Sequence, residues 1–368
     1  MISYKVDLGQ RSYPILIGEG VINLIGSEMV ELAPTKILLV TNETIAPLYA
    51  DVVQKQIQDR LPKVPLSTCI LPDGEEYKNL KAVQRILDSA AELGMDRSSV
   101  IVALGGGVVG DIAGFAASMW MRGIRFVQIP TTLLAQVDSS VGGKTGVNLP
   151  QGKNLIGAFH QPSFVLIDPA VLRTLPSREI SAGLGEVIKY GLLGDEPFFC
   201  RLEKDISKLR QLEMRSLEEV IAHCCRMKAE VVKKDEKEAG IRATLNLGHT
   251  FAHAIEKLFG YGVWLHGEAV GVGLVIAASL SRTLDLLSRQ EEERVRALVL
   301  SAGLRVNTKK FDVKAMVNVM HADKKAQGNE LRFVLIQGIG TSVCRSVKEE
   351  VVCSVLQEFL QNETSVSD

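Results

Sequence analysis

The amino-acid sequence predicts an α/β fold, with a mostly parallel sheet domain followed by an all-helical domain. Its first half alternates short apolar runs with stretches of helical spacing, which is typical of buried parallel strands joined by helices. Beyond about residue 175 helical spacing dominates. At 368 residues the chain also exceeds one typical core, so we expect two domains, at residues 1–175 and 176–368.

Four apolar runs in the first half end in glycine or polar residues and are expected to be parallel strands. They are Lys36–Asn42, Ser98–Gly107, Ile124–Thr132 and Ser163–Asp168. A helix is expected over Asn79–Leu93, since apolar residues recur there at helical spacing and Gly94 follows as a stop. Ligands of parallel sheets gather at the carboxyl ends of the strands, so functional residues are expected after these runs.

The second half is expected to be helical, with one extended segment. The helices are predicted at Ser177–Leu192, Asp195–Leu212, Ser216–Lys237, Leu245–Phe259, Glu268–Asp285 and Gln290–Ser301. Arg332–Gly340 is expected to be a lone strand or extended segment, before a last helix at Val347–Leu360. A helical domain packed at the carboxyl ends of the sheet would form a cleft, and there we expect the active site.

Composition excludes several classes of protein. A net charge of −1 gives no reason to expect a nucleic-acid or membrane partner. The first residues lack a signal-peptide pattern, and no apolar run is long enough to span a membrane. The cysteines show no CxxC spacing and are expected to be reduced thiols. We therefore expect a cytoplasmic protein.

The stretch GGGVVGD (Gly105–Asp111) follows an expected strand and precedes a helix-like run. Gly105, Gly107 and Gly110 satisfy GxGxxG, a spacing that lets backbone amides approach a pyrophosphate at a helix N-terminus. The acidic residue expected about twenty positions later for a ribose is missing. A dinucleotide site and a plain glycine-rich turn both remain open.

Further polar residues follow the other expected strands. DGEEYK (Asp73–Lys78) offers carboxylates for ribose hydroxyls and a cation for phosphate. The stretch Pro130–Asn148 supplies hydroxyls, a carboxylate and a cation, and a further lysine follows in a loop: Thr131, Thr132, Asp138, Lys144 and Lys153. GGKTG, around Lys144, is expected to be a flexible loop. It lacks P-loop spacing, so we reject an ATPase.

Three histidines fall close together in the second half. His249 and His253 are four apart and share a helix face, and His266 follows a glycine-containing turn. With a carboxylate such as Glu186 they would form a catalytic zinc-type site with an open position. From the residues alone, Glu268 competes with Glu186 and His253 with His249.

Other charged and polar residues accompany this cluster. Lys189 lies three positions after Glu186, on the same helix face. The remaining candidates for contacts to an anion are Lys228, Glu238, Arg242, Asn246, Lys324 and Lys325. Each of them also fits an ordinary surface residue.

Taken in order, these motifs closely resemble the 3-dehydroquinate synthase family. The matching stretches run from PDGEEYK, GGGVVGD and PTTLLAQVDSSVGGKTGVN through GKNLIGAF, GEVIKYG, LNLGHTFAHAIE, HGEAV and DKK to RFVL, over about residues 70–340. The resemblance implies an N-terminal Rossmann-like NAD-binding domain, a helical domain, a divalent metal (zinc or cobalt) and a homodimer.

The resemblance also implies roles for individual residues. Metal ligands would be Glu186, His249 and His266. Catalytic residues would be His253 and Glu238, at acid–base positions, and Lys189, which also matches a substrate contact. Substrate contacts would be Arg122 (across the dimer), Asp138, Lys144, Asn154, Lys228, Arg242, Asn246 and Lys325. Contacts to NAD would be Glu75, Lys78, Gly106, Gly107, Asp111, Thr131, Thr132, Lys153 and Thr174, with Asp73 added from the residues alone.

The implied reaction converts a sugar-acid phosphate, 3-deoxy-D-arabino-heptulosonate 7-phosphate, to 3-dehydroquinate and phosphate. NAD is transiently reduced, phosphate leaves by β-elimination, and an aldol step closes the ring. Three alternatives remain: a cyclase of sedoheptulose 7-phosphate, a metal-dependent alcohol or glycerol-phosphate dehydrogenase of similar fold, and an inactive NAD-binding regulatory protein.

Overall fold

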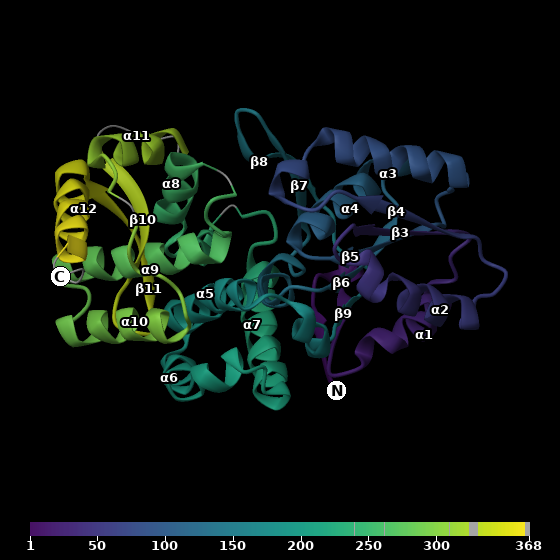
Figure 1. The fold of residues 1–368 in the computed structure, drawn as a ribbon, viewed down its shortest axis with the longest axis horizontal. Coiled ribbons are helices and arrows are strands. Elements are labelled where there is room, and N and C mark those ends of the chain that lie inside the picture. Colours follow the sequence, from purple (N-terminus) through teal and green to yellow (C-terminus); the bar gives the residue numbers. More distant parts are fainter. Residues whose placement is uncertain (239, 261, 309, 324–329, 365–368) are drawn as a thin grey trace. The chain divides into compact units, whose positions relative to one another are not determined.

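The computed structural model describes residues 1–238, 240–260, 262–308, 310–323 and 330–364 (Figure 1). The chain divides into two compact units, which are described separately. Unit 1 comprises Met1–Leu175 and Met214–Lys237, and unit 2 comprises Pro176–Glu213 and Glu238–Asp368. Helix α7 (Met214–Lys234), which we expected in the second domain, groups with unit 1 because it packs on the first strand and on η6 (Ala135–Ser139).

Unit 1 is built on a seven-stranded sheet in the order β1-β2-β9-β6-β5-β3-β4. All neighbours pair in parallel except β1 and β2, so the expected α/β class is confirmed. The strands are β1 (Ile2–Val6), β2 (Tyr13–Ile17), β3 (Ile37–Asn42), β4 (Leu66–Leu71), β5 (Val100–Gly105), β6 (Arg125–Pro130) and β9 (Val165–Ile167). The search for apolar runs in the sequence missed β1, β2 and β4. The strands β1 and β4 mix exposed with buried residues and so form no continuous apolar run.

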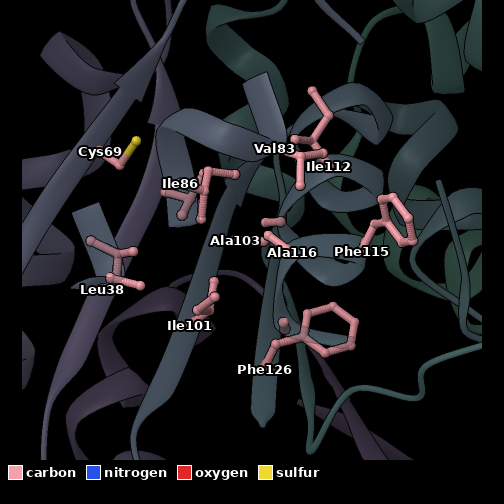
Figure 2. Packing of buried hydrophobic residues seen from close by; sticks show 14 of the residues in the cluster. Leu38, Cys69, Val83, Ile86, Ile101, Ala103, Ile112, Phe115, Ala116 and Phe126 are labelled. Carbon is pink, nitrogen blue, oxygen red and sulfur yellow. The ribbon is translucent and has the colours of Figure 1, made fainter. Parts of the chain in front are cut away.

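Helices cover both faces of this sheet. On one face Leu38 and Val40 pack with α3 (Leu80–Leu93) and α4 (Gly107–Met119), as Figure 2 shows in part. The other face is covered by α1 (Ile25–Leu32) and α2 (Asp51–Arg60), which meet the alternate residues of the same strands. This alternation follows from the two-residue period of a strand.

A separate hairpin corrects one expectation for unit 1. The segments around GGKTG and GKN were expected to be loops, but they form the antiparallel pair β7 (Lys144–Leu149) and β8 (Gly152–Phe159). Their glycines explain the error, because Gly146 and Gly157 allow the two backbones to approach so closely that a Cβ on either would meet a carbonyl oxygen within 2.5 Å.

Unit 2 is mostly helical and also contains one small sheet. The helices are α5 (Ser177–Gly194), α6 (Glu196–Arg210), α8 (His249–Phe259), α9 (His266–Thr283), α10 (Arg289–Ser301), α11 (Val313–Asp323) and α12 (Glu349–Thr364), with the short η8 (Ile241–Asn246). The segment expected as a lone strand is β10 (Glu330–Ile336), and it pairs with β11 (Ser342–Lys348). None of the helices in the described part of the chain is long and apolar enough to cross a membrane.

Candidate functional site

Glycines bring three helices of unit 2 together. A Cβ on Gly267 would lie 1.9 Å from the carbonyl oxygen of Ala182, so α9 and α5 touch through their backbones. In the same way, a Cβ on Gly273 would lie 2.2 Å from the carbonyl oxygen of Gly248, at the start of α8. No larger residue fits at these crossings. The side chains next to them are therefore held close to one another.

Three of those neighbouring side chains form a compact group of possible metal ligands. Glu186 follows Gly185 on α5, His266 precedes Gly267 on α9, and His249 begins α8. Glu186 Oε1 lies 3.4 Å from His249 Nε2 and 3.5 Å from His266 Nε2. One ligand atom from each residue lies within 4.8 Å of the others. A carboxylate and two imidazoles form a donor set typical of catalytic zinc sites.

The remaining ring nitrogens fix which imidazole atoms face Glu186. His249 Nδ1 lies 3.0 Å from the carbonyl oxygen of Leu247, and His266 Nδ1 lies 3.4 Å from a carboxylate oxygen of Glu256. Acceptors at Nδ1 suit the tautomer in which each ring would offer the lone pair of Nε2 to a metal beside Glu186. Burial lowers the pKa of His249, more than the nearby Glu186 raises it, and so favours the neutral form that binds metals.

Neighbouring contacts set Glu268 apart from this group, whereas His253 belongs to a second group of possible ligands, with Glu256 and His266. Glu268 lies outside the group, since it pairs with Arg178 at 2.6 Å and accepts from the backbone of Leu265. The ring of His253 lies 5.7 Å from that of His249 and 6.0 Å from that of His266. The Lys189 ammonium contacts the other oxygen of Glu186, Oε2, and both side chains are buried.

A second polar group of unit 2 lies on η8 and just before it. Asn246 Nδ2 donates to Glu238 Oε1 at 3.2 Å, and Glu238 has a left-handed backbone with φ of 59°. Arg242 is among the largest fully buried side chains, at 1% exposure. Lys324 and Lys325 lie outside the described residues.

In unit 1 the structure joins three of the expected residues in one network. The buried Lys78 ammonium donates to Asp111 Oδ2 at 2.5 Å and to Asn154 Oδ1 at 2.6 Å. Burial raises the pKa of Asp111, and the ammonium of Lys78 acts in the opposite direction. Asn148, which the sequence analysis passed over, donates to Glu75 and accepts from the backbone of Asn154. The only sequence signal that could have indicated Asn148 was its place in the GVN stretch at the end of a matching motif.

The glycine-rich turn after β5 lies against the segment that follows β6. A Cβ on Gly106 would lie 3.0 Å from Thr132 Cγ2, and one on Gly107 would lie 2.9 Å from Ser139 Oγ. Thr131 is 2% exposed, and its Oγ1 has no hydrogen-bond partner among the described residues. Thr132 Oγ1 instead accepts from the amide of Ala135. Bare backbone and a buried hydroxyl at strand ends fit a nucleotide.

Other residues expected to contact a nucleotide form hydrogen bonds or ion pairs with neighbouring segments of unit 1. Asp73 accepts from Asn42 at 2.7 Å and from Thr44 at 2.6 Å, which joins the segments after β3 and β4. Thr174 lies at the end of η7 (Pro169–Thr174), and its Oγ1 lies 2.7 Å from the Tyr49 hydroxyl. Lys153 Nζ lies 4.0 Å from Glu75 Oε1.

The expected substrate contacts of unit 1 fall into separate places. Lys228 on α7 reaches both the backbone oxygen of Asp138 at 2.7 Å and its carboxylate at 3.0 Å. Lys144 begins β7 and is exposed. Arg122 has a left-handed backbone, with φ of 69°, and lines a hollow of about 590 Å³ with Arg97, Arg125 and His160.

Comparisons with known proteins match both parts of the chain to one protein family. Sequence models of the 3-dehydroquinate synthase N-terminal and C-terminal domains match residues 68–182 and 183–326. A 3-dehydroquinate synthase of Azotobacter vinelandii (strain DJ / ATCC BAA-1303) is 51% identical over 344 residues, which cover 93% of each chain.

Two solved structures are similar over nearly the whole chain. A 2-deoxy-scyllo-inosose synthase complexed with carbaglucose-6-phosphate, NAD+ and Co2+ has a TM-score of 0.86 at 27% identity, covering 97% of this chain and 100% of that one. A 2-epi-5-epi-valiolone synthase from Streptomyces hygroscopicus subsp. jinggangensis 5008, with NAD+ and Zn2+ bound, has a TM-score of 0.87 at 27% identity, covering 95% and 97%.

Proposed function

This chain belongs to the 3-dehydroquinate synthase family, and from that premise we propose how its residues convert 3-deoxy-D-arabino-heptulosonate 7-phosphate to 3-dehydroquinate and phosphate. The observation that carries the proposal is the group of Glu186, His249 and His266, whose ligand atoms lie within 4.8 Å of one another. These residues would hold one divalent metal, zinc or cobalt. When bound, the metal supplies Lewis acidity toward the oxygens of the substrate.

Two further residues of unit 2 would handle protons, and a third would orient a ligand. Imidazole is suited to proton transfer near neutral pH, so His253 beside the ligand group is assigned as an acid–base residue. Glu238 is assigned the same kind of role, with its carboxylate oriented by Asn246. Lys189 holds Glu186 Oε2 and thereby turns Oε1 toward the two imidazoles.

Unit 1 would bind NAD, which supplies a reversible hydride acceptor. The backbone amides of the turn at Gly106 and Gly107, at the start of α4, would bind the pyrophosphate, and Thr131 offers a buried hydroxyl. Lys78 holds Asp111 in place for the nucleotide. The other residues assigned to NAD are Asp73, Glu75, Thr132, Lys153 and Thr174.

The charges of the substrate define the remaining roles. A phosphate and a carboxylate are bound by cations, and arginine offers a carboxylate two parallel donors. We assign these contacts to Arg122, Asp138, Lys144, Asn154, Lys228, Arg242, Asn246 and Lys325. A homodimer and a cytoplasmic location remain proposals that rest on the resemblance.

The test incubates the purified full chain with this substrate, catalytic NAD+ and zinc, and follows phosphate and NADH together. Many turnovers of phosphate without NADH accumulation, lost on adding a chelator, are expected. NADH rising in step with product would make the protein a dehydrogenase. Turnover only with sedoheptulose 7-phosphate would make it a sister cyclase.

A further inference from the structure

Glu256 lies beside the ligand group of unit 2 and has no part in the roles assigned above. It stands on α8, seven residues after His249 and three after His253, so all three share one helix face. Its side chain is only 2% exposed. A carboxylate is costly to bury unless it is paired, and so this position calls for a specific partner.

His266 provides that partner through the ring edge that faces away from Glu186. Glu256 Oε2 lies 3.4 Å from His266 Nδ1, and Glu186 Oε1 lies 3.5 Å from His266 Nε2. The two carboxylates therefore contact opposite nitrogens of one imidazole. His249 differs, because its Nδ1 faces only the neutral carbonyl oxygen of Leu247.

We propose that Glu256 is a positioning residue of the metal centre, which fixes the ring orientation and tautomer of His266. The inference rests on the proposed metal site. The need for such a residue is greater at His266 than at His249, because the side chain of His266 is 33% exposed and that of His249 only 12%. A charged acceptor at Nδ1 also makes Nε2 a stronger ligand than a neutral carbonyl does.

A direct ligand role for Glu256 is the rival explanation. Glu256, His253 and His266 also offer ligand atoms within 4.8 Å of one another. A metal there would displace the proton from His266 Nδ1 or require the ring to turn. The positioning role keeps the ring as it stands, with both nitrogens engaged.

The experiment compares Glu256→Gln and Glu256→Ala with the unchanged full chain, each stripped with a chelator and titrated with zinc against a competing dye. Glu256→Ala is expected to weaken zinc binding about 10- to 100-fold, the usual effect of losing an outer-shell partner. Glu256→Gln is expected to fall between, because its amide oxygen still accepts from Nδ1 but carries no charge. Cobalt(II) spectra should shift in band position in both variants. Glu256→Gln keeps nearly the same volume and one acceptor, so its metal-free melting temperature should stay the same.

The matched control is Glu268→Gln, which removes a carboxylate two residues from His266 that pairs with Arg178. Glutamine also serves at the third position of a capping box, so α9 keeps its start. Zinc binding in this control should equal that of the unchanged chain.

Several outcomes would overturn the inference. Unchanged zinc affinity in Glu256→Ala would do so, as would unchanged affinity in Glu256→Gln if the alanine variant does not fold. Complete loss of zinc in both variants, with zinc retained in Glu186→Gln, would make Glu256 a ligand instead. Zinc binding by an unchanged chain without synthase turnover would defeat the proposed function and leave this inference standing.

Discussion

The two units hold their functional side chains in different ways. In unit 1 these side chains come from loops, a hairpin and the helices α4 and α7. Hydrogen bonds join several of them, such as those of Lys78 to Asp111 and Asn154. In unit 2 they lie on helices whose backbones touch at Gly267 and Gly273. A side-chain network loses one contact at a time, whereas a shift between packed helices moves every ligand at once. Substitutions should therefore affect the nucleotide binding proposed for unit 1 and the metal binding proposed for unit 2 in different ways.

The largest expected effect separates the metal from the nucleotide. His266→Ala should lower synthase turnover about a thousandfold or more, because a metal acting as a Lewis acid supplies several kcal/mol. NAD binding should stay unchanged, since none of the residues assigned to NAD lies in unit 2. Bound metal by elemental analysis, turnover, and NADH fluorescence titration check the three statements. Full activity in this variant would place the metal elsewhere.

The next effect tests the helix crossing itself. Gly267→Ala puts a methyl group against the Ala182 carbonyl oxygen, where only 1.9 Å is available, so α5 and α9 must separate. We expect a loss of about 3 kcal/mol in unfolding free energy, the upper end of the usual cost of overpacking. Zinc affinity should fall as well, and both are measured by denaturant titration and dye competition.

Gly271→Ala is the matched control on the same helix. Its added methyl group would meet the end of the Leu304 side chain at 2.9 Å, and that side chain can move. Equal losses of stability and zinc affinity in the two variants would show that the backbone contact at Gly267 has no special part in placing the ligands.

A smaller effect is expected in the network of unit 1. Lys78→Ala leaves the Asp111 carboxylate without its ammonium partner. Removing one partner of a fully buried pair costs about 3–5 kcal/mol, and because Asp111 is 21% exposed we expect about 2 kcal/mol. NAD affinity should fall while zinc affinity stays constant, as calorimetric titrations would report.

The double variant Lys78→Ala with Asp111→Asn sharpens this test. Replacing the unpaired Asp111 carboxylate by an amide should recover part of the lost stability. The two changes are therefore expected to be less than additive. Simple additivity would mean that the two side chains do not act as a pair.

The sequence predicted the α/β class because β3, β5, β6 and β9 are continuous apolar runs. It also located the helix α3, whose first turn is capped by Asn79 and whose end is Gly94 in a left-handed conformation. It missed strands whose pairing depends on tertiary contacts. β11 mixes half-buried with exposed residues and becomes a strand through its pairing with β10. The helix α7 was expected, but its place in unit 1 depends on its packing against β1, which the sequence does not show.

For the site, residue types and spacing could identify candidates but could not choose among them. Residue type alone makes Glu186 and Glu268 equal candidates for a carboxylate ligand, and the pairing of Glu268 with Arg178 separates them in the structure. Glu256 and Asn148 act on other side chains, so no motif marks them. Positioning residues are set by three-dimensional contacts that a linear pattern does not contain.

The smallest effect concerns the pH dependence of unit 1, through His160. Its ring stacks on Phe126 and its Nε2 donates to the carbonyl oxygen of Ile124 at 2.7 Å. Burial lowers the pKa of His160 below the ordinary histidine value of 6.5. Between the lowered pKa and 6.5 the unfolded chain binds more protons, so stability falls as the pH drops through this window and is unaffected at higher pH. His160→Gln keeps a donor for Ile124 and should flatten this slope in denaturant midpoints measured from pH 7.5 to 5. The same slope in both proteins would show that His160 does not cause the acid sensitivity, and His249, whose pKa burial also lowers, would be the next candidate.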